Sequence, residues 1–291
     1  MINIGNYICA QGGRTVSEIH RTPSSAVQSA LGAYACRVRV VCYDTVDSTN
    51  NQAKLHAAEA DSPALYIART QTGGRGRLGR SFHSPAHTGL YMTVAYTTNE
   101  SLGEAVRVTA GAAVAAASAI EELTGLQLAI KWVNDLYLKG CKVGGILTEA
   151  VTLEGGRTRM VVGIGINLTT TEFPDGLRAP ASCLFTGEDA ETIPPDLSDR
   201  LAGEITRRLL GLVDASSDCP WDGGLKGEAC LDFYRRRLLY VGEEVICTRG
   251  EDTFAGVVEG VDEGFSLLLR VQGQTRVLSS GEISVRPVGK S

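Results

Sequence analysis

Residues 73–80 read Gly-Gly-Arg-Gly-Arg-Leu-Gly-Arg and follow closely on a predicted strand at Leu65–Ala68. Glycine lets backbone N–H groups approach an anion closely, and arginine presents forked donors that suit phosphate and carboxylate oxygens. No acidic residue occurs between Asp61 and Glu100. The stretch therefore predicts an anion-binding site. Taken alone, the same pattern also fits a solvated basic turn or an arm that faces RNA.

The overall composition is that of an ordinary globular protein. The 291 residues include 28 basic and 33 acidic side chains, and 43% are apolar, which indicates one large core and a small second domain. The longest apolar runs, such as 110–120, are shorter than the roughly 20 residues that a membrane span requires. Residues 1–10 lack the pattern of a signal peptide, so we expect a cytoplasmic protein. A pI of about 5.5 argues against bulk nucleic-acid binding.

The cysteines and histidines show no metal-binding pattern. The eight cysteines are spread along the whole chain without a C-x-x-C pair, which argues against a disulfide scaffold and a zinc finger. His83 and His87 have the spacing of a helical metal pair, but Pro85 between them disfavours a regular helix. We expect reduced, mostly buried thiols and no metal bound by histidine.

Gly74, Gly76 and Gly79 also match the G-x-G-x-x-G pattern of dinucleotide-binding folds. Those folds require a helix immediately after the glycines, whereas residues 81–89 contain Pro85 and end at a glycine. A protein kinase is excluded as well, because neither an H-R-D catalytic loop nor a D-F-G motif follows.

Three further segments place polar side chains at the ends of predicted strands. They are Ile-Lys-Trp-Val-Asn-Asp-Leu-Tyr at 130–137, Lys-Val-Gly-Gly-Ile-Leu at 142–147 and Gly-Ile-Gly-Ile-Asn at 163–167. Lys131, at the end of a predicted strand, can act as a point charge toward phosphate. Asp135 can orient Lys131 or hold Mg²⁺. Taken singly, Asn134-Asp135 also suits a turn, and 163–167 also suits a buried strand interrupted by glycine.

Five segments in this order together resemble the biotin protein ligase family. The family pattern reads D-S-T-N, G-R-G-R-x-G-R, K-W-P-N-D, K-x-x-G-I-L and G-x-G-I-N. The corresponding residues are 47–50, 74–80, 131–135, 142–147 and 163–167. The resemblance covers roughly Tyr43 to Arg286. Val133 stands where the family has proline, and Phe82 stands where an aromatic residue, often tryptophan, follows the basic loop.

This resemblance implies an ATP-dependent ligase. Such an enzyme joins the carboxylate of biotin to the α-phosphate of ATP, releases pyrophosphate, and passes biotin from biotinyl-5′-AMP to a lysine of a biotin carboxyl carrier protein. It implies biotin, ATP and Mg²⁺, with no tightly bound prosthetic group. Because two anions must meet, this chemistry requires fixed cations more than a protein nucleophile.

The resemblance also implies which residues form the site. The residues expected to bind biotin are Ser48, Thr49, Asn50, Gln71, Gly74, Arg75, Gly76, Arg77, Lys142 and Gly145. Those expected to bind the nucleotide are Arg80, Phe82, Lys131, Asn134, Asn167 and Arg286. The expected catalytic residues are Lys142, Arg77 and Arg75, and Asp135 is a candidate ligand of Mg²⁺. We expect residues 72–84 to be mobile without ligand and ordered with it.

The implied fold is α+β. It combines a mixed β-sheet flanked by helices, resembling the catalytic domains of class II aminoacyl-tRNA synthetases, with an SH3-like β-barrel. Five short alternating strands separated by glycines follow Tyr240 and fit a small barrel. We divide the chain into a lead-in segment at 1–36, a catalytic domain at 37–238 and a barrel at 239–291.

Local patterns predict the individual elements. Helices are expected at 24–31, 52–59, 102–123, 197–213 and 225–237, with residues 47–50 supplying caps to the second of them. Strands are expected at 37–43, 65–68, 90–96, 128–132, 145–151, 160–166, 244–248, 254–261, 266–271, 274–278 and 283–286.

Three alternatives remain at this point. A lipoate ligase or octanoyl transferase would have a similar sheet, although the Gly/Arg loop and the K-W-x-N-D segment favour biotin. A biotin-responsive repressor would need an N-terminal winged helix-turn-helix, and residues 1–42 lack a convincing helix pair, so DNA binding is not expected. A silent biotin sensor is disfavoured by Lys142 and the loop arginines. No membrane partner is expected, and a homodimer is left open.

Overall fold

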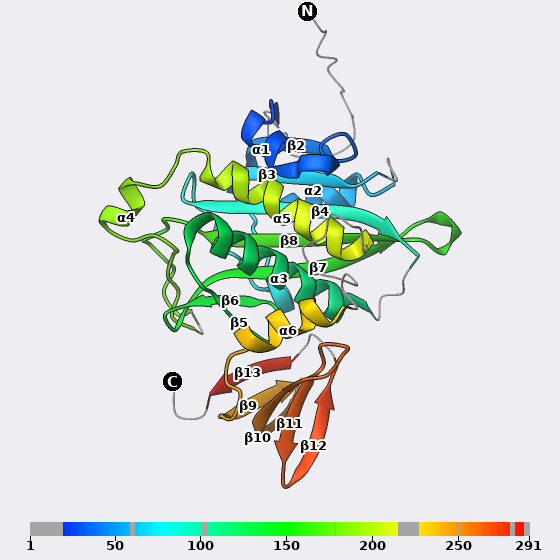
Figure 1. Ribbon diagram of the computed structural model, residues 1–291, viewed down its shortest axis with the longest axis vertical. Coiled ribbons are helices and arrows are strands. Elements are labelled where there is room, and N and C mark those ends of the chain that lie inside the picture. The colour runs from blue at the N-terminus through cyan, green and yellow to red at the C-terminus, as the bar shows by residue number, and fades with distance from the viewer. Residues whose placement is uncertain are drawn as a thin grey trace, which may run out of the picture.

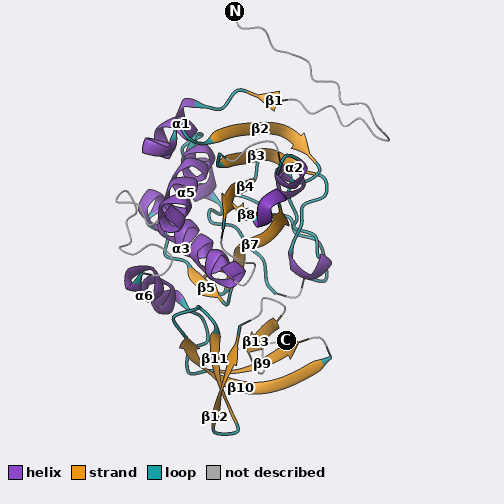
Figure 2. Cartoon of the chain, turned by 90° about the vertical axis from the view of Figure 1, so that its right-hand side faces the viewer, coloured by secondary structure: helices purple, strands orange, loops and turns teal. Residues whose placement is uncertain are grey.

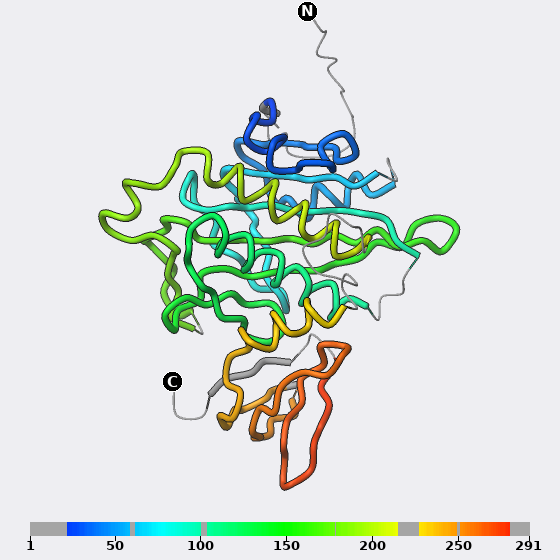
Figure 3. The backbone as a smooth tube through the Cα atoms, in the orientation of Figure 1, coloured from blue at the N-terminus to red at the C-terminus, as the bar shows by residue number. Residues whose placement is uncertain are grey.

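The computed structural model describes residues 20–58, 62–99, 104–177, 179–214, 227–249, 251–279 and 283–287. They form an eight-stranded mixed sheet and a five-stranded antiparallel sheet, which lies at one end of the molecule (Figure 1). Figure 3 follows the chain from the N-terminal segment of the large sheet, in blue, to the C-terminal sheet at the opposite end. The expected α+β fold, with a second small antiparallel sheet, is confirmed.

The strand order of the large sheet is β1-β2-β3-β4-β8-β7-β6-β5. Its strands are β1 (His20–Arg21), β2 (Arg39–Val46), β3 (Ala64–Gln71), β4 (Gly89–Thr98), β5 (Ala129–Lys131), β6 (Asp135–Leu138), β7 (Cys141–Thr152) and β8 (Thr158–Asn167). Strands β2 and β3 are parallel, and the other neighbours are antiparallel.

Helices cover the two faces of this sheet unequally. The helices are α1 (Ser25–Leu31), α2 (Thr49–Leu55), α3 (Ala105–Thr124), α4 (Glu188–Glu191), α5 (Leu197–Asp214) and α6 (Glu228–Arg237). Figure 2 shows α1, α3 and α5 on one face and α2 on the other. Helix α3 is rich in alanine, buried through most of its length, and ends at Gly125 in the left-handed conformation, as good helix formers and a glycine cap dictate.

Helix α1 is part of the same hydrophobic core. Ser24 caps it, because its hydroxyl accepts a 3.3 Å hydrogen bond from the N–H of Val27. Val27 and Leu31 are fully buried, and a Cβ atom on Gly203 of α5 would lie 2.6 Å from the Cβ of Ala30. Residues 25–31, within the expected lead-in segment, therefore pack closely on α5. The domain boundaries at 36 and 238 stay predictions.

The C-terminal sheet has the strand order β12-β11-β10-β9-β13. Its strands are β9 (Glu244–Arg249), β10 (Asp252–Val261), β11 (Leu267–Val271), β12 (Gln274–Leu278) and β13 (Ile283–Pro287). All five expected strands are thus present. The end of β10 contacts helix α6, where Arg235 donates to the carbonyl of Val261 at 2.9 Å.

Several element boundaries differ from the sequence-based expectations. The caps of α2 were wrong in part, because Thr49 and Asn50 lie inside the helix, whose N-cap is Ser48. Strand β6 was not among the expected strands. Asn134 lies in a turn, as one alternative had it, whereas Asp135 begins a strand that pairs with β5 and β7. The short helix α4 was also missed. The expected starts of α3 and α6 lie outside the described residues.

The described residues bear on two expectations, which concern disulfide bonds and membrane-spanning helices. The six cysteines among them are free thiols, and Cys42, Cys183, Cys230 and Cys247 are buried. Within the described ranges no helix has the length and apolar character needed to cross a membrane.

Candidate functional site

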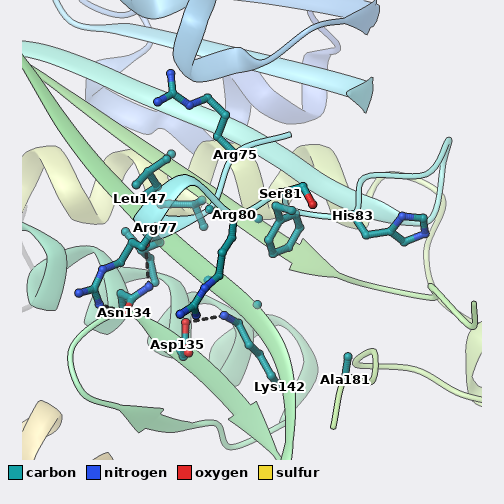
Figure 4. A pocket seen from close by; sticks show the side chains of 18 of the residues that line it. Arg75, Arg77, Arg80, Ser81, His83, Asn134, Asp135, Lys142, Leu147 and Ala181 are labelled. Carbon is teal, nitrogen blue, oxygen red and sulfur yellow. Dashed lines mark hydrogen bonds and ion pairs between the residues drawn. The ribbon is translucent and has the colours of Figure 1, made fainter. Parts of the chain in front are cut away.

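A cavity of about 670 Å³ lies between the Gly/Arg loop and strands of the large sheet (Figure 4). It brings together side chains from all five sequence motifs. The expected site residues that line it are Ser48, Thr49, Asn50, Gln71, Arg75, Gly76, Arg77, Arg80, Phe82, Lys131, Asn134, Asp135, Lys142, Gly145 and Asn167. Gly74 belongs to the same loop without lining the cavity, and the side chain of Arg286 lies outside the described part of the chain.

One end of the cavity carries a chain of hydroxyl and amide groups. The side-chain oxygen of Gln71 accepts hydrogen bonds from the backbone N–H and the hydroxyl of Thr49, at 2.9 and 3.2 Å. Its nitrogen donates to the hydroxyl of Ser84 at 3.0 Å. The hydroxyl of Thr93 lies 2.8 Å from that of Thr49. These contacts fix the orientation of each polar group and make this end suited to a small polar ring.

Two glycines of β8 allow site side chains to lie directly on the sheet. A Cβ atom on Gly163 would lie 2.1 Å from the amide oxygen of Asn50, and one on Gly165 would lie 2.6 Å from the ring of Phe82. The opposing residues of β4, in register, are Thr93 and Tyr91. Strand β8 pairs with β4 without a bulge, so the glycines serve close approach of side chains. Strand β8 is therefore buried, as one alternative had it, but pairs with β4 without the expected bulge.

The Gly/Arg loop folds back on itself over the cavity. The N–H of Gly76 donates to the carbonyl of Arg80 at 2.7 Å, and the N–H of Phe82 donates to the carbonyl of Gly74 at 2.9 Å. A Cβ atom on Gly74 would lie 2.3 Å from the carbonyl oxygen of Phe82. Gly79 has a φ of 70°, which favours glycine. The glycines therefore make a compact turn from which the arginines project.

The three arginines of the loop point in different directions. Arg77 donates to the amide oxygen of Asn134 at 2.5 Å, and Figure 4 shows Arg80 extending toward Asp135. Arg75 extends the opposite way, where its guanidinium donates to Asn51 at 2.9 Å. Two of the three cations thus face the interior of the cavity.

Lys142 is held at the cavity by its backbone and its side chain. Its N–H donates to the carbonyl of Pro180 at 2.8 Å, and its carbonyl accepts from Ser182 at 3.0 Å. Its ammonium lies 2.6 Å from the carboxylate of Asp135, and the side chain is 32% exposed. Asp135 therefore orients Lys142, whereas the sequence had suggested that it orients Lys131 or holds Mg²⁺. In the described part of the chain, His, Cys, Asp and Glu side chains form no group of three that could hold a metal ion.

The turn between β5 and β6 is anchored from several sides. Asn134 donates to the carbonyl of Ile146 at 3.0 Å, and the N–H of Ile146 donates back to the carbonyl of Asn134 at 2.8 Å. The peptide bond between Trp132 and Val133 is cis, at the position where the family pattern has proline. The turn presents Asn134 to Arg77 and Asp135 to Lys142.

Asn167 ends β8 on another wall of the cavity. Its amide nitrogen donates to the carbonyl of Ser182 at 3.0 Å. Its amide oxygen is buried and has no hydrogen-bond partner among the described residues. Phe82 meets Tyr91 edge to face, with ring centroids 6.4 Å apart. This wall therefore offers an apolar ring and a free acceptor.

Comparison with known proteins gives this arrangement a family. Residues 42–167 match the biotin/lipoate A/B protein ligase family. The bifunctional ligase/repressor BirA of Bacillus spizizenii is 30% identical over 278 residues, which cover 94% of this chain and 82% of the relative. The biotin–[acetyl-CoA-carboxylase] ligase of Paracoccus denitrificans is 30% identical over 245 residues, which cover 81% and 96%. The chain belongs to the biotin protein ligase family.

A solved structure agrees with this assignment. The biotin protein ligase from Aquifex aeolicus, in complex with biotin and ATP, has a TM-score of 0.66 and 27% identity to this ligase. The alignment covers 86% of this chain and 99% of that one. The family suggested by the five motifs is thereby confirmed.

Glu149 and Thr93 are among the polar residues beside the cavity of this ligase that were not expected from the sequence. Glu149 of β7 binds Arg75 at 3.2 Å, and Thr93 of β4 lies 2.6 Å from the amide oxygen of Asn50. Glu149 follows Gly145 and Leu147 at the two-residue spacing of one strand face, so the alternation of β7 could have revealed it. Thr93 carries no such signal, because only the pairing of β4 with β8 brings it to the site.

Proposed function

We propose that this ligase activates biotin with ATP to biotinyl-5′-AMP and then transfers biotin to a lysine of a biotin carboxyl carrier protein. The observation that carries the proposal is the composition of one cavity. It combines the hydrogen-bonded groups of Thr49 and Gln71 with the cations of Arg77 and Lys142. A polar ring and an anion can therefore bind in the same cavity.

The polar end suits the ureido ring of biotin. That ring has two N–H donors and one carbonyl acceptor, and each would lose its hydrogen bonds to water on burial. Ser48, Thr49 and Gln71 supply oxygen acceptors and hydroxyl donors there. Because Gln71 is itself fixed by Thr49 and Ser84, the site is organised before the substrate arrives.

The cations suit the two reacting anions. In the first step a carboxylate oxygen of biotin attacks the α-phosphorus, the bond from that phosphorus to the bridging oxygen breaks, and pyrophosphate leaves. Lys142 and Arg77 reduce the repulsion between carboxylate and phosphate and stabilise the charge of the transition state. In the second step the amine of the carrier lysine attacks the acyl carbon, AMP leaves, and the amine loses a proton.

The nucleotide is assigned to the wall that Phe82 and Asn167 form. Arg80 and Lys131 supply positive charge for phosphate oxygens, and Phe82 supplies an aromatic face. The amide oxygen of Asn167 supplies an acceptor. Arg286 of β13 is proposed as a further phosphate contact on the family resemblance alone.

Mg²⁺ accompanies ATP in this proposal, but the described residues do not fit a protein cage for it. Asp135, the candidate ligand, is paired with Lys142 at 2.6 Å, and the described part of the chain offers no carboxylate cluster beside it. Mg²⁺ commonly keeps several waters and binds through substrate phosphates. We therefore assign it to the phosphates of ATP, and the steps above rest on the cations of the protein.

The acceptor is proposed to be the carrier domain of a biotin-dependent carboxylase or decarboxylase. Support comes from the Paracoccus relative, whose name specifies acetyl-CoA carboxylase. The cytoplasmic location and the absence of DNA binding stay predictions, and a homodimer stays an open alternative.

Transfer to a carrier tests the proposal. Purified protein, ATP, Mg²⁺ and biotin are incubated with an apo carrier domain, and the product is analysed by mass spectrometry. We expect one biotinyl group on one lysine of the carrier. An unmodified carrier with biotin, together with modification by lipoate or octanoate, would contradict the proposal.

A further inference from the structure

The carboxylate of Glu149 joins three elements beside the biotin-binding end of the cavity. Its Oε1 lies 3.0 Å from the ammonium of Lys54 and 3.2 Å from the guanidinium of Arg75. Its Oε2 accepts a 3.0 Å hydrogen bond from the amide of Asn50. Strand β7, helix α2 and the Gly/Arg loop therefore meet at one side chain, which the proposed chemistry does not use.

The ion pair between Glu149 and Arg75 fixes the N-terminal end of the Gly/Arg loop. Arg75 bridges Glu149 on β7 and Asn51 on α2, at 3.2 and 2.9 Å. The next residue, Gly76, begins the compact turn closed by its hydrogen bond to Arg80. Because this hydrogen bond holds the loop in a compact turn, fixing Arg75 also restricts the position of Arg77 inside the cavity.

The contact with Asn50 fixes an amide at the wall of the cavity. Asn50 is buried, its nitrogen donates to Glu149 at 3.0 Å, and its oxygen lies 2.6 Å from the hydroxyl of Thr93. A carboxylate accepts hydrogen bonds and never donates them when ionised. The orientation of the Asn50 amide is thereby determined, with its nitrogen toward β7 and its oxygen toward β4.

The charges explain why a carboxylate is needed at this position. Burial by itself would raise the pKa of Glu149, but hydrogen bonds from Asn50 and Lys54 and the charges of Lys54 and Arg75 hold that pKa below its usual range. Glu149 is thus ionised at neutral pH. Without its negative charge, Lys54 and Arg75 would be two neighbouring cations with no counterion between them.

We propose that Glu149 is a positioning residue that couples closure of the Gly/Arg loop to the biotin-binding wall. This inference rests on the proposed function, since biotin is the ligand it concerns. Glu149 acts through Arg75 and Asn50 and touches no reacting atom. Arg75 accordingly serves as the anchor of the loop through its side chain, while Arg77 faces the substrates.

Glu149→Gln tests this proposal, because it keeps the shape of the side chain and removes its charge. In biotin-dependent ATP–pyrophosphate exchange we expect the KM for biotin to rise about tenfold or more, the equivalent of one lost charge-assisted hydrogen bond. The KM for ATP and the kcat should change far less. A uniform loss in kcat with both KM values unchanged would overturn the proposal.

The loop contact has its own readout, which needs no activity. Trypsin can cut after the loop arginines, and mass spectrometry identifies the site. Without ligand, we expect Glu149→Gln to be cut in the loop several times faster than the wild type, with an unchanged melting temperature. Equal cutting rates would overturn the proposal. If wild-type protein shows no biotin-dependent exchange, the proposed function fails, whereas this assay still tests the contact.

Two further variants complete the test. Arg75→Gln should reproduce the faster cutting after Arg77 and Arg80, the loop sites that all variants share. At these sites the double variant should be no worse than either single one, because both substitutions remove the same contact. Arg75 is 42% exposed at its side chain, so this variant serves if Glu149→Gln does not fold. The matched control is Glu154→Gln, an exposed acid just after β7, which should leave both readouts unchanged. Additive effects in the double variant would contradict the coupling.

Discussion

The indole N–H of Trp132 donates a 2.8 Å hydrogen bond to the backbone carbonyl of Phe265. Phe265 lies in the turn between β10 and β11, and its ring meets Tyr234 of α6 edge to face at 5.3 Å. The hydroxyl of Tyr234 in turn donates to the carbonyl of Val133 at 3.3 Å. The C-terminal sheet and α6 therefore hold the turn that presents Asn134 to Arg77 and Asp135 to Lys142.

Trp132→Phe should weaken this connection. The variant keeps an aromatic ring but removes the N–H group, so the carbonyl of Phe265 loses its donor, at a cost of about 1–3 kcal/mol. We expect a lower melting temperature and a higher KM for ATP. The control is Val277→Ala, at an exposed position on β12 of the C-terminal sheet. A Trp132→Phe protein indistinguishable from wild type in both measurements would refute this role.

Lys142→Ala should abolish adenylate formation and leave the fold intact. The side chain is 32% exposed, so its removal opens no core cavity, while the loss of one preorganised charge typically costs about 10² to 10³ in rate. Pyrophosphate exchange and circular dichroism measure the two effects. The control is Lys139→Asn, which removes a neighbouring positive charge in the turn before β7. Asparagine tolerates the backbone there, which has a φ of 50°. Normal exchange in Lys142→Ala would exclude the assigned role.

Gly165→Ala should displace Phe82 from the sheet. The added methyl group would lie 2.6 Å from the ring, so the ring must move and the nucleotide wall changes shape. We expect the KM for ATP to rise about tenfold, as a lost stacking contact of about 1–1.5 kcal/mol implies. The double variant Gly165→Ala with Phe82→Ala removes the clash. Its stability should return toward that of the wild type, whereas its KM for ATP should stay raised. An unchanged KM in the single variant would count against the proposed wall.

Glu204 should make stability depend on pH. Burial alone would raise its pKa, but hydrogen bonds and charges of Arg207 and Arg208 hold the pKa below its usual value of 4.5. A carboxyl group with a depressed native pKa stabilises the fold above its unfolded pKa and loses that contribution as pH falls through the folded pKa. Urea unfolding should therefore separate wild type from Glu204→Gln at pH 7 and bring them together in strong acid. A constant difference at all pH values would contradict this assignment.

The sequence located most residues that line the cavity but not the groups that support them. Thirteen of the fifteen expected site residues that line it belong to the five motifs, and Gln71 and Phe82 lie outside them. Glycines and cations at strand ends carry a strong local signal. Thr93 was missed because only the pairing of β4 with β8 brings it beside Asn50, whereas the alternation of β7 could have revealed Glu149. The contacts of Arg75 with Asn51 and Glu149 could not be predicted either, because both partners are distant from Arg75 in sequence.

Strand boundaries show the same limit. Asn134-Asp135 is a good turn sequence, yet Asp135 opens β6 because β5 and β7 both supply hydrogen-bond partners. Helix α1, in contrast, was predicted correctly, since the serine cap and the apolar spacing are local features. The mobility expected for residues 72–84 without ligand stays a prediction, which the tryptic assay addresses directly.

The most direct test of the proposed function is ATP–pyrophosphate exchange with purified protein and, in parallel, biotin, lipoate and octanoate. We expect exchange that depends on biotin and is lost in Lys142→Ala. Exchange that depends on lipoate or octanoate, with none for biotin, would contradict it.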